Sequence, residues 1–160
     1  LIFLKELNPL MGGIGPFIPH KDTPLANEKG GTLEKTITML ALVRLMLPKI
    51  LLPATTALGS VDPLGREKGL KAGANVVMPN LSPTNVREKY SLYDGKICTG
   101  DEAAECRVCI ERRINAAGFN LEITRGDSLA LSNTEKENIN SKLVDNKNNG
   151  VKLDNIVLIN

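Results

Sequence analysis

Two kinds of apolar pattern alternate along the first 80 residues. Runs with an apolar residue at every third or fourth position predict helices, and proline or glycine ends each of them. Short runs of consecutive apolar residues between them predict buried strands. The helices are expected at residues 1–8, 32–47 and 62–73, and the strands at residues 12–18, 50–56 and 74–79. Strands joined by helices of this length favour parallel βαβ units.

This order of elements predicts an α/β fold. Three parallel units are typical of about the last three βα units of a (β/α)8 TIM-type barrel, whose active site lies at the carboxyl ends of the strands. Three strands cannot close a barrel, and the chain opens inside the apolar phrase Leu1-Ile2-Phe3-Leu4. We therefore expect further barrel units upstream, and assign residues 1–82 to the C-terminal part of the barrel.

The character of the sequence changes after Ser82. Residues 83–131 are expected to form a C-terminal extension, with a loop at 90–100, a helix at 101–117 and a short strand at 121–124. Residues 132–160 are rich in Asn, Lys, Asp and Glu, which favours a polar, disordered tail. The final Ile-Val-Leu-Ile run favours a β-strand, but its role is not predicted.

Composition excludes two classes of partner. The formal net charge is only +2 and aromatic residues make up 3% of the chain, so a nucleic-acid surface is not expected. The most apolar stretch, residues 39–47, is much shorter than the roughly 20 residues of a membrane span. With an odd number of cysteines and no signal segment, the sequence predicts a cytoplasmic protein.

The three cysteines lie within twelve residues, in the spacing C-x7-C-x2-C. Cys106 and Cys109 would lie one turn apart on the predicted helix, and Cys98 would reach them from the preceding loop. Thiolates select zinc, copper(I) or iron–sulfur clusters. A fourth ligand is not identified, although acidic residues lie nearby at positions 101, 102 and 105. The alternative is three inert thiols.

Other candidates have ordinary structural interpretations beside the functional ones. His20 is either a base or ligand, or a surface loop residue. Thr55-Thr56 follows a strand, where it either binds an anion at the barrel mouth or caps a helix. Met11 and Met78 lie beside strands and by default belong to the core.

Four phrases, together with the cysteine spacing, resemble a known family. They are residues 13–28 (GIGPFIPHKDTPLANE), 53–59 (PATTALG), 73–80 (GANVVMPN) and 92–98 (LYDGKIC). In this order they resemble the radical S-adenosylmethionine maturases of FeFe-hydrogenase, a biotin synthase-like family. The resemblance covers about residues 1–125.

The resemblance implies a barrel in which a 4Fe-4S cluster cleaves S-adenosylmethionine to a 5′-deoxyadenosyl radical, which acts on an organometallic or small-molecule precursor of the hydrogenase cluster. Other hydrogenase maturation proteins are its implied partners. In the family, the later cysteines, here Cys98, Cys106 and Cys109, hold an accessory 2Fe-2S or 4Fe-4S cluster. By the same resemblance, Met11, Pro16 and Ile18 lie against the nucleoside, and Thr55, Thr56, Met78 and Tyr93 line the internal cavity.

The family's C-x3-C-x2-C motif is absent from the 160 residues, so no catalytic residue is assigned and the chain alone is expected to be inactive. Two alternatives remain open. One is a related biotin synthase-like or methylornithine synthase-like enzyme. The other is a non-catalytic module that binds an iron–sulfur cluster or zinc.

Overall fold

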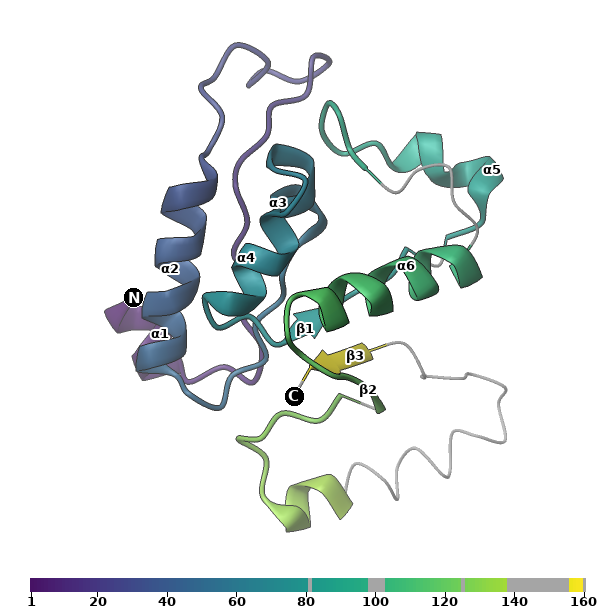
Figure 1. The fold of residues 1–160 in the computed structure, drawn as a ribbon. Coiled ribbons are helices and arrows are strands. Elements are labelled where there is room, and N and C mark those ends of the chain that lie inside the picture. The colour runs from purple at the N-terminus through teal and green to yellow at the C-terminus, as the bar shows by residue number, and fades with distance from the viewer. Residues whose placement is uncertain (81, 98–102, 125, 138–155, 160) are drawn as a thin grey trace.

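The computed structural model describes residues 1–80, 82–97, 103–124, 126–137 and 156–159 of the chain (Figure 1). Its elements are α1 (Ile2–Leu7), α2 (Leu33–Met46), α3 (Thr56–Val61), α4 (Gly65–Lys71), β1 (Val76–Val77), α5 (Thr84–Arg87), the 3-10 turn η1 (Glu88–Tyr90), α6 (Ala103–Ala116), β2 (Leu121–Thr124) and β3 (Ile156–Ile159). Residues 133–137 add one further helical turn. None of the helices in this part of the chain is long and apolar enough to cross a membrane.

Three segments of the first half lie side by side in parallel. Met11 pairs with Leu51, and Pro53 pairs with Val76. The amide of Ala54 donates to the carbonyl oxygen of Val76 at 2.8 Å. Helix α2 connects the first segment to the second, and α3 and α4 connect the second to the third. The predicted parallel order of consecutive βα units is therefore confirmed.

The strand predicted at residues 12–18 is wrong. Pairing at this place is limited to residues 10–12, where the amide of Gly12 donates to the carbonyl oxygen of Leu51 at 3.0 Å. Beyond it the segment contains Pro16, which has no amide hydrogen for a strand partner, and Gly13 and Gly15, which weaken a strand.

The helix predicted at residues 62–73 is observed as the shorter helix α4, and a separate helix, α3, precedes it. Thr55 caps α3, since its hydroxyl accepts a hydrogen bond from the amide of Leu58 at 3.4 Å. Asp62 then accepts from the amide of Leu64 at 2.7 Å, and this Asx turn separates α3 from α4. The chain therefore reverses tightly here. A Cβ atom added at Gly65 would lie only 2.0 Å from the carbonyl oxygen of Leu58.

Two clusters of buried apolar residues pack the helices against the parallel segments. Helix α2 packs against the second parallel segment and α3 through Leu33, Leu40, Val43, Leu47, Ile50, Leu52 and Leu58. Helices α4 and α6 pack on β1 through Ala54, Leu70, Ala74, Val77, Ile110, Ile114 and Ala117. The helix predicted at residues 101–117 is thus observed as α6, with Gly118 at φ +90° just beyond it.

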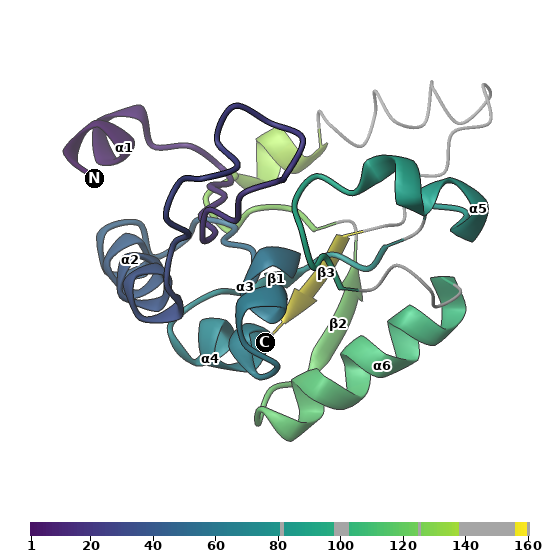
Figure 2. The same ribbon diagram turned by 90° about the horizontal axis from the view of Figure 1, so that it is seen from above.

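The last strand, β3, adds an antiparallel part to the sheet. Figure 2 shows β3 between β1 and β2, in the order β1-β3-β2. Within the segment expected to be disordered, the structure thus contains β3 and the helical turn at 133–137, which Ser132 and Glu135 cap reciprocally. Residues 138–155 lie outside the described part, and the proposed division at residues 82 and 131 stays a prediction.

Candidate functional site

The carboxyl ends of the parallel segments meet at one edge of the sheet. Gly15 follows the first segment, Thr55 and Thr56 follow the second, and Met78 follows β1. A Cβ atom added at Gly15 would lie 2.9 Å from Oγ1 of Thr55, so these two loops touch. In parallel α/β folds this is the edge that carries the chemistry.

A cavity of about 190 Å³ opens at this edge. Its lining residues are Thr56, Arg66, Met78, Pro79, Asn80, Lys96 and Ile97. It brings together Thr56 and Met78, two of the residues expected to line an internal cavity. Arg66, only 5% exposed, donates from Nη2 to Oγ1 of Thr56 at 3.2 Å. Lys96 adds a second cation, so the cavity favours a ligand with anionic groups.

Sequence reasoning missed Arg66, Asn80 and Lys96 at this cavity. Asn80 directly follows the phrase that ends at Pro79, so its position after a strand was an available signal. No local pattern marked Arg66 or Lys96, since both reach the cavity only through the packing of α4 and of the 90–97 loop.

Thr55 lies beside the cavity, and its hydroxyl caps α3. Met11 lies at a paired position and is 39% exposed. Pro16 is buried, with its Cα 3.2 Å from a Cβ atom added at Gly31, and Ile18 is half-buried. Of the three residues expected against the nucleoside, Met11 thus lies in the first parallel segment and Pro16 and Ile18 follow it, and none of them lines this cavity.

Tyr93 lies in a loop that packs against residues 19–21. The amide of Asp94 donates to the carbonyl oxygen of Pro19 at 3.2 Å, and the amide of Lys21 donates to Oδ2 of Asp94 at 3.1 Å. The Tyr93 hydroxyl is buried and has no hydrogen-bond partner among the described residues. Tyr93 is not among the residues that line the cavity beside Thr56. Because a buried, unsatisfied hydroxyl is costly, its position is suited to a polar partner.

His20 has a local role in the same loop. Its Nδ1 accepts a hydrogen bond from the amide of Asp22 at 3.1 Å, within a turn in which the Thr23 hydroxyl also donates to the His20 carbonyl oxygen at 2.8 Å. These contacts agree with the structural interpretation of His20 as a loop residue.

The cysteine site is described only in part. Cys106 and Cys109 lie on α6, one helical turn apart in the backbone, and Cys109 is an exposed free thiol. Cys98 lies outside the described residues. The chemistry of the donor set fits a thiophilic metal or cluster, while the convergence of the three thiols stays a prediction.

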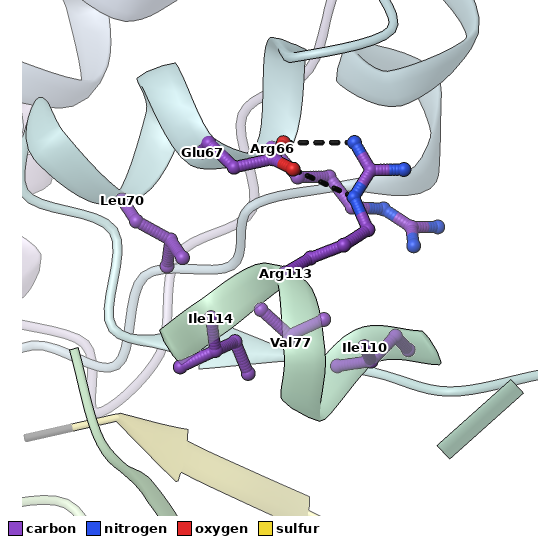
Figure 3. A pocket seen from close by; sticks show the side chains of 7 residues that line it. All are labelled: Arg66, Glu67, Leu70, Val77, Ile110, Arg113 and Ile114. Carbon is purple, nitrogen blue, oxygen red and sulfur yellow. Dashed lines mark hydrogen bonds and ion pairs between the residues drawn. The ribbon is translucent and has the colours of Figure 1, made fainter. Parts of the chain in front are cut away.

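Helix α6, which carries two of the cysteines, is fixed to α4 by a charge pair above an apolar contact (Figure 3). Arg113 donates from Nε and Nη2 to the two carboxylate oxygens of Glu67 at 2.7 and 2.8 Å. Ile110 and Ile114 pack beneath this pair against Val77. Burial, the largest single effect, raises the pKa of Glu67, but the hydrogen bonds from Arg113 and from the Glu67 backbone amide, together with the charges of Arg113 and Arg66, lower the pKa below its ordinary value.

Comparison with known proteins places these features in a family context. No family model matches the chain. The chain is 52% identical over 118 residues to the FeFe hydrogenase maturase subunit HydE of Thermotoga maritima, a match that covers 74% of this chain and 34% of that protein. It is 33% identical over 91 residues to the 3-methylornithine synthase of Methanosarcina acetivorans, covering 57% of this chain and 25% of that enzyme.

The 3-methylornithine synthase of Methanosarcina barkeri matches at a similar level, 33% identity over 87 residues, 54% of this chain and 24% of that enzyme. The resemblance deduced from the four phrases and the cysteine spacing is therefore confirmed. The chain is a homologue of the FeFe hydrogenase maturase HydE, and it spans about a third of the length of that relative.

Proposed function

We propose that the chain forms the C-terminal part of a radical S-adenosylmethionine enzyme that matures the active-site cluster of FeFe-hydrogenase. The observation that carries the proposal is the 52% identity to HydE over 118 residues. The cavity supports it, because Thr56 and Met78, both expected at an internal cavity, meet at the carboxyl edge of the parallel segments. S-adenosylmethionine would supply the radical chemistry when bound.

The chain's own residues would bind and orient the reactants. The Tyr93 hydroxyl would find in a polar ligand the hydrogen-bond partner that it lacks among the described residues. Arg66 and Lys96 would neutralise negative charge on a small-molecule or organometallic substrate in the cavity. Thr56, already held by Arg66, would present its hydroxyl to the same ligand.

A chimera tests this proposal. The segment of Thermotoga maritima HydE that matches the chain is replaced by the chain's own 118 matching residues. Because the two segments share about half of their residues, we expect the chimera to mature FeFe-hydrogenase when it is expressed with the other maturation proteins. A Thr56→Val change in the chimera removes the hydroxyl at nearly constant volume, and we expect it to lower maturation. A folded chimera that cleaves S-adenosylmethionine but matures no hydrogenase would contradict the assignment.

We also propose that Cys98, Cys106 and Cys109 hold an accessory iron–sulfur cluster. The three thiols lie in twelve consecutive residues, two of them one turn apart on α6. Exposed Arg107 and Arg112 on this helix would offset the negative charge of a cluster held by thiolates, whereas Arg113 is held by Glu67. Iron and sulfide content after anaerobic reconstitution tests the site. Each Cys→Ser variant should bind much less of both, with Met78→Leu as the unchanged control, and equal uptake by the triple variant would refute it.

A second candidate function is methylornithine synthesis, because two 3-methylornithine synthases match more than half of the chain. The same segment exchange in the Methanosarcina acetivorans enzyme separates the two candidates. Since identity to HydE is 52% and identity to that synthase is 33%, we expect this second chimera to form no 3-methylornithine.

A further inference from the structure

Two loops at the carboxyl edge of the parallel segments are joined by a reciprocal pair of hydrogen bonds (Figure 1). The amide of Asp94 donates to the carbonyl oxygen of Pro19 at 3.2 Å, and the amide of Lys21 donates to Oδ2 of Asp94 at 3.1 Å. Lys21 and Asp94 are 73 positions apart in the sequence. Asp94 therefore clamps the loop at residues 16–31 to the loop at residues 90–97.

Each of the two clamped loops carries residues expected to face a reactant. Ile18, expected against the nucleoside, lies directly before Pro19, and Tyr93 lies directly before Asp94. The Tyr93 hydroxyl is buried and has no hydrogen-bond partner among the described residues. Lys96, two residues after Asp94, lines the cavity of about 190 Å³. The clamp thus connects the side of the edge expected to hold the nucleoside with the side that forms the cavity.

Both loops are also anchored to the fold away from the clamp. The amide of Gly31 donates to the carbonyl oxygen of Phe17 at 2.8 Å, and a Cβ atom added at Gly31 would lie 2.8 Å from the Phe17 amide nitrogen. In the other loop, the amide of Ile97 donates to Oγ of Ser60 on α3 at 3.3 Å. With one loop anchored at Phe17 and the other at Ile97, the bonds of Asp94 fix the stretches beyond these anchors against each other.

The clamp is a local restraint, because Asp94 is exposed. A hydrogen bond at the surface competes with water, so it adds little to the free energy of unfolding of the whole chain. It does, however, restrict the backbone of the 16–31 loop at Lys21. A loop that is already ordered loses less conformational entropy when a ligand binds, so a restraint of this kind acts on ligand affinity more than on folding.

We propose that Asp94 is a positioning residue for S-adenosylmethionine, which holds Ile18 and the Tyr93 hydroxyl at a fixed spacing for that ligand. The inference rests on the proposed function, which makes S-adenosylmethionine the ligand of this edge. Asp94 acts through its two neighbours in the clamp, Pro19 and Lys21. The group that matters is the side-chain oxygen that accepts from the Lys21 amide, so an uncharged acceptor of the same shape can replace the carboxylate.

Substitutions at Asp94 in the HydE chimera test the proposal. Asp94→Ala removes the acceptor for the Lys21 amide, whereas Asp94→Asn keeps a side-chain oxygen at the same place. In equilibrium dialysis with radiolabelled S-adenosylmethionine, we expect Asp94→Ala to raise the Kd roughly fivefold to tenfold and Asp94→Asn to raise it less than about threefold. The melting temperature and the rate of 5′-deoxyadenosine formation at saturating S-adenosylmethionine should change little. An alanine variant with the Kd of the unmodified chimera would overturn the proposal.

Glu28→Ala is the matched control, since Glu28 is an exposed acidic residue of the same 16–31 loop, and it should leave the Kd unchanged. Deuterium exchange follows the clamp without any turnover. Peptides that cover residues 19–24 should exchange faster in the Asp94→Ala chimera than in the Asp94→Asn and Glu28→Ala chimeras, and equal exchange in all three would overturn the clamp. An unmodified chimera that binds no S-adenosylmethionine would instead refute the proposed function, while the exchange rates still decide whether Asp94 orders the loop.

Discussion

Gly73 is constrained both by its backbone conformation and by close packing against a neighbouring helix. Its φ is +108°, and an added Cβ would lie 2.7 Å from Cβ of Arg44 on α2. Nε of Arg44 also donates to the Gly73 carbonyl oxygen at 2.7 Å, which ties α2 to the turn before β1. We expect Gly73→Ala to lower the free energy of unfolding by about 1–3 kcal/mol, measured by urea denaturation.

Gly13 provides the matched control for this substitution. It has no left-handed φ, and no atom lies within 4 Å of an added Cβ. Gly13→Ala should change the free energy of unfolding by less than about 1 kcal/mol. If both alanine variants unfold at the same urea concentration, the turn at Gly73 is not under the constraint described.

Residues whose role depends on sequence neighbours were predictable, and those with distant partners were not. Thr32 caps α2 by accepting from the amide of Lys35 at 3.3 Å, as the local pattern indicates. Asn75, in contrast, uses its side-chain oxygen to accept from the amide of Leu52 at 2.8 Å. That hydrogen bond joins two neighbouring segments through residues that are 23 positions apart in the sequence, so no local sequence pattern marks it.

At the scale of elements, the pair between Glu67 and Arg113 makes the docking of α6 sensitive to acid. The pKa of Glu67 is lower in the folded chain than its ordinary value, so folding favours the charged carboxylate. The pair therefore stabilises the chain above the pKa of an unfolded glutamate, about 4.3. This stabilisation is lost as the pH falls through the lower folded value. We expect Glu67→Gln to reduce the difference in melting temperature between neutral and acid pH.

The control for this titration is Glu111→Gln, at an exposed residue of α6. This variant should keep the pH dependence of the unmodified chain, including the part contributed by Asp62, whose pKa is lowered by its hydrogen bond from Lys68. A Glu67→Gln chain with the same acid-side loss of melting temperature as the Glu111→Gln chain would show that the pair does not set it.

The elements themselves were partly predictable. Helices α2 and α6 follow directly from apolar spacing and a proline or glycine stop, and α2 also from its capping residue Thr32. Helix α3 was missed because its six residues, TALGSV, contain a glycine and three residues of low helix propensity. It forms because Thr55 caps it and because Leu58 is buried against α2. The second interaction is a tertiary contact, which the local sequence does not reveal.

At the scale of the whole molecule, helix α1 exposes several apolar side chains. Ile2, Phe3 and Leu7 are 74%, 72% and 61% exposed. The parallel segment at residues 10–12 follows directly and, among the described residues, pairs on one side only, with Leu51. Exposed apolar surface beside an unpaired strand edge promotes association. We expect light scattering to show dimers or larger species that decrease in an Ile2→Glu, Phe3→Glu variant.

Leu45 on α2 supplies the comparison, since it is 80% exposed on another helix. Leu45→Glu should leave the size distribution unchanged. A monomeric unmodified chain with a cooperative melt would contradict the association. Strand β3 covers the outer edge of β1, so among the described residues the second open edge of the sheet lies at β2.

The isolated chain is expected not to cleave S-adenosylmethionine. All three of its cysteines lie at positions 98, 106 and 109, and their spacing does not match the C-x3-C-x2-C loop that holds the radical-generating cluster in the resembled family. Chromatography for 5′-deoxyadenosine, after anaerobic incubation with dithionite, should show no product above the level without protein. Intact HydE serves as the positive control, and repeated turnover by the 160-residue chain would refute the expectation.

The pairing of β1 with β3 has a consequence for the order of folding. Pro53 and Val76 are joined through a loop of about 23 residues, but Val77 and Val157 are joined through about 80. Loop-closure entropy alone makes the longer connection about 1 kcal/mol more costly. The parallel segments should therefore assemble first and β3 should dock last. Its withdrawal should be the lowest-energy opening of the sheet, exposing β1 while the parallel pairs remain closed.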